Sequence, residues 1–198
     1  MPSLDTPICE YIPEAKDIKL NEASRPFTFR EVASHAAGIP QEGDFDRWEG
    51  GDMQDVATIL KNLNRESPFP SYTRFHYSNI GFILLGLALQ KIAKMPFNEY
   101  VSSHILKPLG MTSSCFEFNQ DCNKEKEATG YFKDKTPTPT AQYQDCAPCG
   151  GMLTTLSDLA KYIRFLMTTE SLEYKDILHP ASVRELHAPV MMHWSYKP

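Results

Sequence analysis

Apolar residues recur at helical intervals along much of the chain. The most apolar stretch covers residues 80–94, where apolar side chains occupy nearly every face, as is typical of a buried central helix. Pro96 ends this pattern, because the residue before a proline is disfavoured in the helical conformation. Apolar residues at helical spacing also predict helices over residues 52–63 and from residue 97 to the Pro108-Leu109-Gly110 stop. The pattern therefore predicts a chain built mainly of helices.

Capping residues predict where the shorter helices begin and end. Thr28 followed by Glu31 has the spacing of a capping box, and Gly38 suits a left-handed helix end. Together they predict a helix over residues 29–37. Pro180 at a first helical position predicts a last short helix near the end of the chain.

A further capped helix is predicted after the middle of the chain. Thr155 and Asp158 have capping spacing, and the apolar pattern that follows runs to about residue 168. One face of this helix is lined by apolar residues, namely Leu156, Leu159, Ala160, Ile163, Leu166 and Met167.

Two stretches lack a helical period. Residues 66–75 contain two prolines and are predicted to form an extended approach to the central helix. Residues 112–149 are polar and mostly aperiodic, and a loop of that length in a compact domain is usually functional or mobile. No internal repeat or interdomain linker is visible, so residues 1–198 are interpreted as one partial domain.

Composition and charge exclude several classes of protein and of partner. Its 198 residues are 41% hydrophobic and 23% charged, which is typical of a globular protein with a sizeable core. A net charge of -5 provides no basic field for phosphates, so no nucleic acid partner is expected. The longest apolar run, residues 80–89, is too short for a membrane span. The N-terminus lacks the layout of a signal peptide, which leaves the compartment open.

Cysteine is present in an odd number of copies. The five are Cys9, Cys115, Cys122, Cys146 and Cys149. The absence of a secretion signal favours five reduced thiols, although two disulfides and one free thiol remain an alternative. Cys146 and Cys149 have the spacing of a redox dithiol or of half a zinc site, but no second pair completes a tetrahedral site. We therefore expect neither a metal nor a cofactor.

The candidate chemistry lies just before the central helix, in Tyr77-Ser78-Asn79. Tyr77 and Asn79 are two residues apart in a non-helical approach, so both side chains can point to one side and share a cleft. A purely structural alternative is that Ser78 or Asn79 caps the helix while Tyr77 packs with its hydroxyl bonded. His76 is expected to point the other way, as a solvated or packing residue.

Short motifs follow one another in a characteristic order over residues 4–167. They are Leu4-Asp5-Thr6-Pro7, Tyr11-Ile12-Pro13-Glu14, Thr28-Phe29-Arg30-Glu31-Val32, His35-Ala36-Ala37-Gly38-Ile39-Pro40, Tyr77-Ser78-Asn79, Pro108-Leu109-Gly110-Met111, Thr129-Gly130-Tyr131, Gly150-Gly151-Met152-Leu153-Thr154-Thr155 and Asp158-Leu159-Ala160. This ordered set resembles the serine beta-lactamase-related proteins, which include class C beta-lactamases, low-molecular-weight penicillin-binding proteins and related esterases. The resemblance implies a truncated piece of an α+β beta-lactamase/transpeptidase-like fold, mainly α as the chain stands because the family's sheet strands lie largely outside this span.

The resemblance also implies roles for two side chains. Proteins of this family use a Ser-x-x-Lys pair, in which the serine attacks a carbonyl and the lysine helps to remove its proton. Tyr77 matches a catalytic tyrosine that shares in proton transfer, and Asn79 matches a substrate-binding amide. A phenol ionises only near about pH 10, so such a tyrosine depends on a nearby cation such as that lysine. His35, Gly38 and the Gly150-Gly151 pair also match the family, and we expect structural roles for them.

The nucleophile motif itself is missing. No serine of the chain is followed by a lysine three residues later, and Gly-x-Ser-x-Gly is also absent. The family places Ser-x-x-Lys upstream of the segment matched at residues 4–14 and a Lys- or His-x-Gly strand near its C-terminus, so we expect this chain to lack both. The resemblance thus implies a partial serine hydrolase for amide, ester or peptide carbonyls, inactive as an isolated chain. The alternative is a pseudoenzyme that serves as a non-catalytic binding module.

Overall fold

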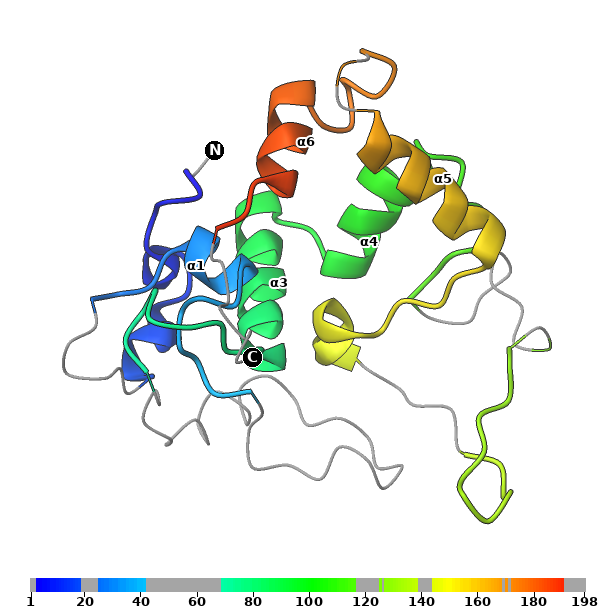
Figure 1. Ribbon diagram of the computed structural model, residues 1–198, viewed down its shortest axis with the longest axis horizontal. Coiled ribbons are helices and arrows are strands. Elements are labelled where there is room, and N and C mark those ends of the chain that lie inside the picture. Colours follow the sequence, from blue (N-terminus) through cyan, green and yellow to red (C-terminus); the bar gives the residue numbers. More distant parts are fainter. Residues whose placement is uncertain are drawn as a thin grey trace, which may run out of the picture. The chain divides into compact units, whose positions relative to one another are not determined.

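The computed structural model describes residues 3–18, 25–41, 69–116, 125, 127–138, 144–168, 170 and 172–190. The chain divides into two compact units (Figure 1). Unit 1 comprises Met1–Lys94, Thr140–Gly150 and Val190–Pro198, and unit 2 comprises Met95–Pro139 and Gly151–Pro189. The described residues are mostly helical and contain isolated β-bridges but no β-strand, as the sequence predicts. The helix predicted over residues 52–63 lies outside the described residues.

The predicted central helix is α3, Asn79–Ala93, in unit 1. Ser78 caps it, because the Ser78 Oγ accepts a hydrogen bond from the Gly81 N–H at 2.9 Å. Lys94, with φ at 53°, adopts the left-handed conformation that ends the helix. Figure 1 shows α1 alongside α3, and the unit 1 core forms around α3. The fully buried apolar side chains of α3 are Ile80, Ile83, Leu84 and Ala88.

Helix α1, Phe29–Ala33, begins with the predicted capping box. The Glu31 Oε2 accepts from the Thr28 N–H at 2.7 Å, and the Thr28 Oγ1 accepts from the Glu31 N–H. The Glu31 carboxylate is fully buried and is also paired with Arg25 at 3.0 Å. This start of the helix follows local rules that the sequence alone reveals.

The predicted end of this helix is wrong. The helix stops four residues earlier than expected, because His35 and not Gly38 is the first left-handed residue after it, with φ at 58°. The His35 N–H donates to the Val32 carbonyl and the Ala36 N–H to the Glu31 carbonyl, the two bonds of a Schellman motif. Gly38 also has a positive φ, of 74°, but it lies in the segment beyond the helix.

The described residues of unit 1 also form three short 3-10 turns: η1, Ile8–Glu10, η2, Pro13–Asp17, and η5, Gln144–Cys149. The N-terminal segment is held to the start of α1 by a two-bond pairing between the Asp5 carboxylate and the Arg30 guanidinium, at 2.8 and 3.1 Å. That guanidinium lowers the pKa of Asp5. Turn η5 packs against α3, so part of the predicted 112–149 loop is ordered.

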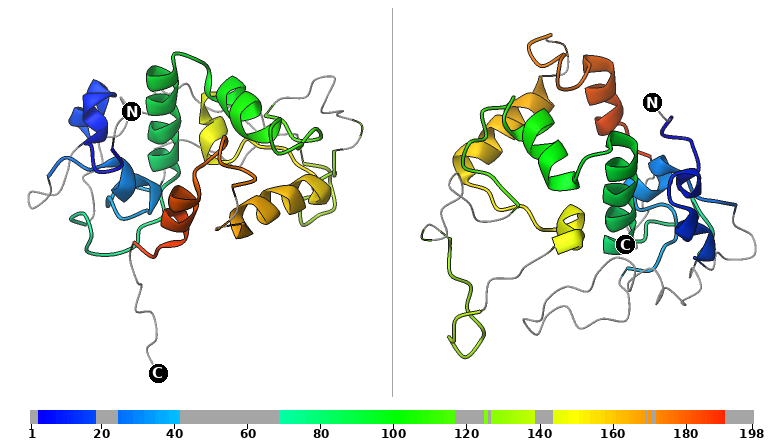
Figure 2. Two further views of the ribbon diagram at one scale, coloured as in Figure 1. Left: turned by 90° about the horizontal axis from the view of Figure 1, so that it is seen from above. Right: turned by 180° about the vertical axis from the view of Figure 1, so that it is seen from behind.

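Unit 2 contains α4, Phe97–Val101, its π-helical continuation η3, Ser102–Leu106, and α5 and α6, which are Leu156–Met167 and Pro180–His187. Figure 2 shows these helices from two further sides. Their starts agree with the predictions. The buried side chains of the unit 2 core are Leu106, Leu109, Met111, Phe165 and Val183.

The apolar face that the sequence predicts for α5 is largely exposed in the structure. Leu156, Ile163 and Met167 are 87%, 48% and 76% exposed. The buried positions are Phe165 and Asp158. Helical spacing defines an apolar stripe, but which face is covered depends on the neighbouring elements.

A buried carboxylate fastens the start of α5 to the segment before it. The Asp158 Oδ2 accepts from the Ser113 N–H at 2.7 Å and from the Ser114 hydroxyl at 2.9 Å, and the Lys161 Nζ lies 2.7 Å from Oδ1. Lys161 also donates to the Gly110 carbonyl. We call the Asp158 carboxylate with Ser113, Ser114 and Lys161 the Asp158 clamp.

The expectation that all five thiols are reduced is wrong. Cys115 is disulfide-bonded. Cys9 is a free thiol, and Cys146 is fully buried in the unit 1 core. The thiol of Cys146 therefore contributes to packing beneath α3.

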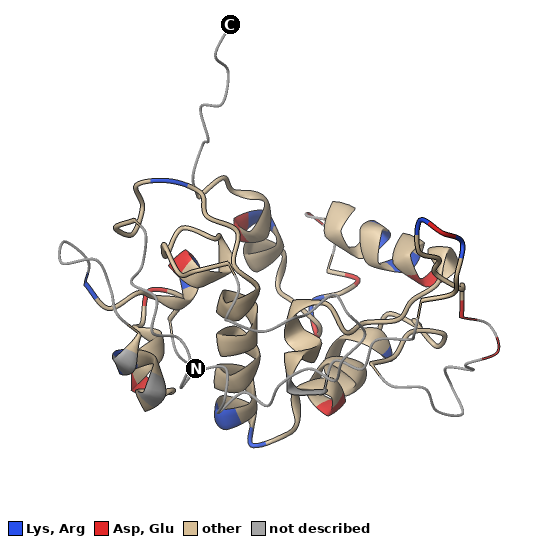
Figure 3. Ribbon diagram, turned by 90° about the horizontal axis from the view of Figure 1, so that it is seen from below, with Lys and Arg blue, Asp and Glu red and all other residues tan. Residues whose placement is uncertain are grey.

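Charges of both signs occur in both units (Figure 3). Within the part of the chain that the structure describes, no individual helix has the length and apolarity of a membrane span; α3 and the segment Phe97–Leu106 reach them only when taken together.

Candidate functional site

The structure brings Tyr77 and Asn79 together at the start of α3. The Tyr77 hydroxyl donates to the Asn79 Oδ1 at 3.0 Å, as the two-residue spacing in an extended segment allows. Tyr77 is 46% exposed, whereas Asn79 is 7% exposed. The phenol thus lies at the surface, and its bond fixes the orientation of the amide below it.

Backbone carbonyls from a distant part of the chain hold this pair in place. The Ser78 Oγ donates to the Pro40 carbonyl at 2.7 Å, and the Asn79 N–H donates to the Gln41 carbonyl at 3.0 Å. These carbonyls belong to residues 35–41, which we call the clamp segment. Gly38 gives this segment a left-handed turn that a glycine adopts without strain. Gly38 therefore has a structural role, but it shapes the clamp segment and does not end the helix.

His35 contributes to the clamp segment with both backbone and side chain. Its carbonyl accepts from the His76 N–H at 2.8 Å, and its Nδ1 accepts from the Ser78 N–H at 3.1 Å. Alternate amides of an extended segment point to the same side. His35 therefore accepts hydrogen bonds from the His76 and Ser78 amides, as a neighbouring β-strand would. The sequence predicts only an unspecified structural role for this residue. The motif match at His35 is the sequence signal that could have indicated more.

Aromatic rings surround the His35 imidazole. Its centroid lies 4.7 Å from the ring of Tyr77, 5.1 Å from Phe82 and 5.4 Å from Phe75. Burial lowers the pKa of His35 below its ordinary value of 6.5, and the charge of His76 lowers this pKa further. The neutral ring, whose Nδ1 can accept a hydrogen bond, is therefore the favoured form near neutral pH.

His76 packs away from the Tyr77–Asn79 pair, as expected. Its Nδ1 lies 2.8 Å from the Ile39 carbonyl, and its ring meets that of Phe69 edge-on at 5.6 Å. Because a carbonyl oxygen only accepts, the His76 Nδ1 carries a proton. His76 is therefore a packing residue that helps to hold the clamp segment.

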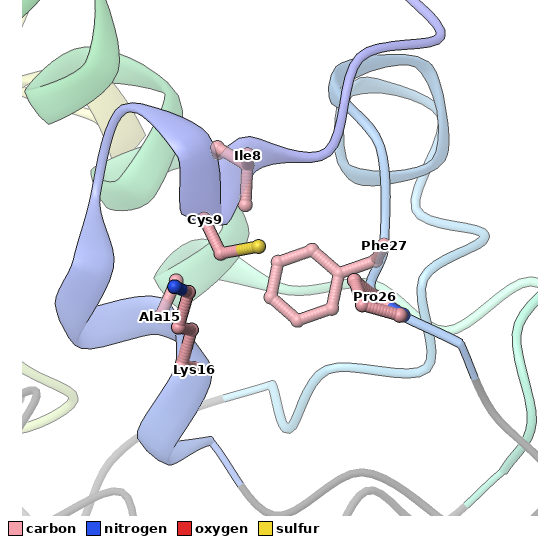
Figure 4. A pocket seen from close by; sticks show the side chains of 6 residues that line it. All are labelled: Ile8, Cys9, Ala15, Lys16, Pro26 and Phe27. Atoms are coloured by element: carbon pink, nitrogen blue, oxygen red, sulfur yellow. The ribbon is translucent and has the colours of Figure 1, made fainter.

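No metal centre is found among the described residues, where no group of three or more His, Cys, Asp or Glu side chains could hold an ion. A separate cavity of about 250 Å³ lies in unit 1, away from Tyr77 and Asn79. Figure 4 shows the Cys9 sulfur directed toward the ring of Phe27 within it. Its lining combines apolar side chains with one thiol and one ammonium group: Ile8, Cys9, Ala15, Lys16, Pro26 and Phe27. The phenol–amide pair thus remains the candidate site.

Comparison with known proteins points to one family. The sequence model of the Beta-lactamase family matches residues 3–196. Beta-lactamase-like protein 2 of Dictyostelium discoideum is 32% identical over 197 residues, which are 96% of this chain and 35% of that protein. Protein flp of Staphylococcus aureus is 26% identical, with 89% of this chain and 36% of that protein covered.

Solved structures show the same relationship in three dimensions. A class C beta-lactamase superposes with a TM-score of 0.70 at 23% identity, covering 90% of this chain and 47% of that one. The octameric penicillin-binding protein homologue from Pyrococcus abyssi gives 0.71 at 26% identity, covering 98% and 45%. The chain therefore spans about a third of the length of these curated relatives and just under half of these solved chains.

Proposed function

Because this chain belongs to the Beta-lactamase family, we propose that Tyr77 and Asn79 form one wall of a carbonyl-binding site for acyl transfer. The family acts on carbonyl-containing substrates. The observation that carries the proposal is the 3.0 Å bond from the Tyr77 hydroxyl to the Asn79 Oδ1 at the capped start of α3. It supports a fixed arrangement of two groups suited to a carbonyl compound.

Each group has a distinct task in this proposal. The amide of Asn79, oriented by Tyr77, orients the substrate by hydrogen bonding. In acyl transfer, a bond forms between a serine oxygen and the carbonyl carbon, the bond to the leaving group breaks, and the serine proton passes to that leaving group. The exposed phenol of Tyr77 shares in this proton transfer, with the serine and its lysine supplied by polypeptide outside these 198 residues.

Binding of carbonyl compounds tests this proposal on the chain as it exists. We expect a β-lactam such as benzylpenicillin, an aryl ester and an N-acetyl dipeptide to shift the NMR signals of Tyr77 and Asn79, with affinity near about 1 mM because only one wall is present. Asn79→Ala should weaken this binding about fivefold, as expected for the loss of one hydrogen bond. The control is Tyr131→Phe, which removes an exposed hydroxyl in unit 2. Probes that bind the variant Asn79→Ala as tightly as the natural chain would contradict the proposal.

A second candidate is a binding module without catalysis, which needs no Ser-x-x-Lys pair. It uses the same wall to recognise a peptide or a partner protein.

Labelling with a fluorescent penicillin and with a fluorophosphonate tests for a nucleophile in this chain. We expect no serine of the isolated chain to become acylated or phosphonylated, because no lysine stands three residues after any serine. Mass spectrometry of the intact protein, with a serine hydrolase as positive control, makes the measurement. A stoichiometric adduct on one defined serine would refute the expectation and exclude the non-catalytic candidate.

A further inference from the structure

His35 occupies a backbone position at which a glycine would be unstrained. Its φ of 58° lies in the left-handed region, at the Schellman position where helices usually place glycine. A glycine here would close α1 equally well. What histidine adds is an imidazole, and that imidazole contacts the Tyr77-Ser78-Asn79 segment directly.

The imidazole makes two contacts with the segment that carries the candidate pair. Its Nδ1 holds the backbone N–H of Ser78, the residue between Tyr77 and Asn79, at 3.1 Å. Its ring supports the Tyr77 ring, whose hydroxyl bonds the Asn79 amide. The rotation of Tyr77 and the path of the backbone into α3 therefore both depend on the same side chain.

The protonation state of His35 decides whether this support exists. The Ser78 N–H is a donor, so the Nδ1 must be unprotonated and the ring proton must sit on Nε2. A protonated ring presents two N–H groups and cannot accept this bond. His76 differs, because its Nδ1 already carries a proton toward the Ile39 carbonyl, and adding a second proton leaves that bond intact.

We propose that His35 is the positioning residue of the Tyr77–Asn79 pair, and that protonation of its imidazole releases the Ser78 amide and loosens the pair. The consequence for carbonyl binding rests on the proposed function, but the release itself does not. Among the described residues, the titratable groups around the ring are His76 and Tyr77, and α3 presents the apolar ring of Phe82. Burial and the charge of His76 lower the pKa of His35, so the release is expected at a lower pH than for an ordinary histidine.

An NMR titration of the full chain from pH 7.5 to 4.5 tests the proposal. We expect the Ser78 amide and the Tyr77 ring signals to change with the midpoint of the His35 ring itself, below 6.5. Hydrogen exchange of the Ser78 amide, corrected for the intrinsic dependence on pH, should become about fivefold faster when His35 is protonated. A Ser78 amide that does not respond while His35 titrates would overturn the proposal.

Two variants separate positioning from folding. His35→Gly suits the backbone conformation, so the amides of α3 should keep their protection, while the Ser78 amide exchanges about fivefold faster at pH 7.5 and its transition disappears. His76→Gln keeps a donor for the Ile39 carbonyl, and the Ser78 transition should persist and move to higher pH, because the charge that opposes protonation of His35 is gone. Unchanged Ser78 exchange in the first variant, or loss of the transition in the second, would exclude His35.

The carbonyl probes distinguish this inference from the proposed function. Probe binding that weakens across the His35 transition is the result expected if both are correct. A Ser78 transition without any probe binding would sink the proposed function and leave the positioning role standing. Probe binding at Tyr77 and Asn79 that stays constant through the transition would support the proposed function and overturn the positioning role of His35.

Discussion

Replacing Leu84 with alanine is expected to lower the free energy of unfolding of unit 1 by about 3–5 kcal/mol, the largest effect that we expect of a single substitution. Leu84 is fully buried on α3, within the cluster that also contains Ile8, Val32 and Ile80. Alanine would remove most of the side chain and leave a cavity that the packed neighbours fill only in part.

Hydrogen exchange of the α3 amides measures this loss in the unit concerned. The chain divides into two units, so unfolding of the whole chain need not be a single transition. Leu4→Ala is the matched control, because Leu4 also belongs to unit 1 but is 45% exposed, and it should change stability by less than about 0.5 kcal/mol. Equal effects of the two substitutions would show that α3 is not the centre of a packed core.

Replacing Asp158 with alanine is expected to lower the free energy of unfolding of unit 2 by about 2–4 kcal/mol. The substitution removes the acceptor of the part-buried Ser113 N–H and one of the two side-chain partners of the buried Ser114 hydroxyl, whose other partner is Thr154. Lys161 is 43% exposed and returns to water, so the cost stays below that of stranding a buried charge. Exchange of the α5 amides reports the change.

Acid should also destabilise unit 2, because it protonates the carboxylate of the Asp158 clamp. Burial raises the pKa of Asp158, but the bonds from Lys161, the Ser113 N–H and the Ser114 hydroxyl more than offset this, and the net shift is downward from 3.8. The carboxylate therefore stabilises unit 2 fully above about pH 4, and this contribution is lost as the pH falls through the lowered value. Asp158→Ala should remove that part of the acid dependence. Glu170→Gln, at an 83% exposed ion-pair position, should leave it unchanged.

Local features of the fold follow from the sequence, and the helix starts show why. Thr28, Ser78 and Thr155 each cap a helix through a side-chain bond to a backbone N–H three residues on. Such bonds involve neighbours in the chain, so they can be predicted without knowing the tertiary structure. The meeting of Tyr77 and Asn79 is of the same kind, because a spacing of two in extended backbone places both on one side.

Long-range contacts decided what the sequence left open. Whether α5 buries Leu156 or Phe165 depends on which elements cover it, and helical periodicity alone does not say which side is covered. The bond from the Ser78 N–H to the His35 Nδ1 likewise joins residues 43 positions apart, so only the tertiary structure reveals it.

The sequence by itself determined the family, the helix starts and the adjacency of the phenol and the amide, since each depends on residues a few positions apart or on motifs in order. The tertiary structure alone showed that residues 35–41 hold that pair and that an imidazole in a left-handed turn accepts the Ser78 amide. The physical reason is that these bonds join atoms distant along the chain, and only packing brings such atoms together.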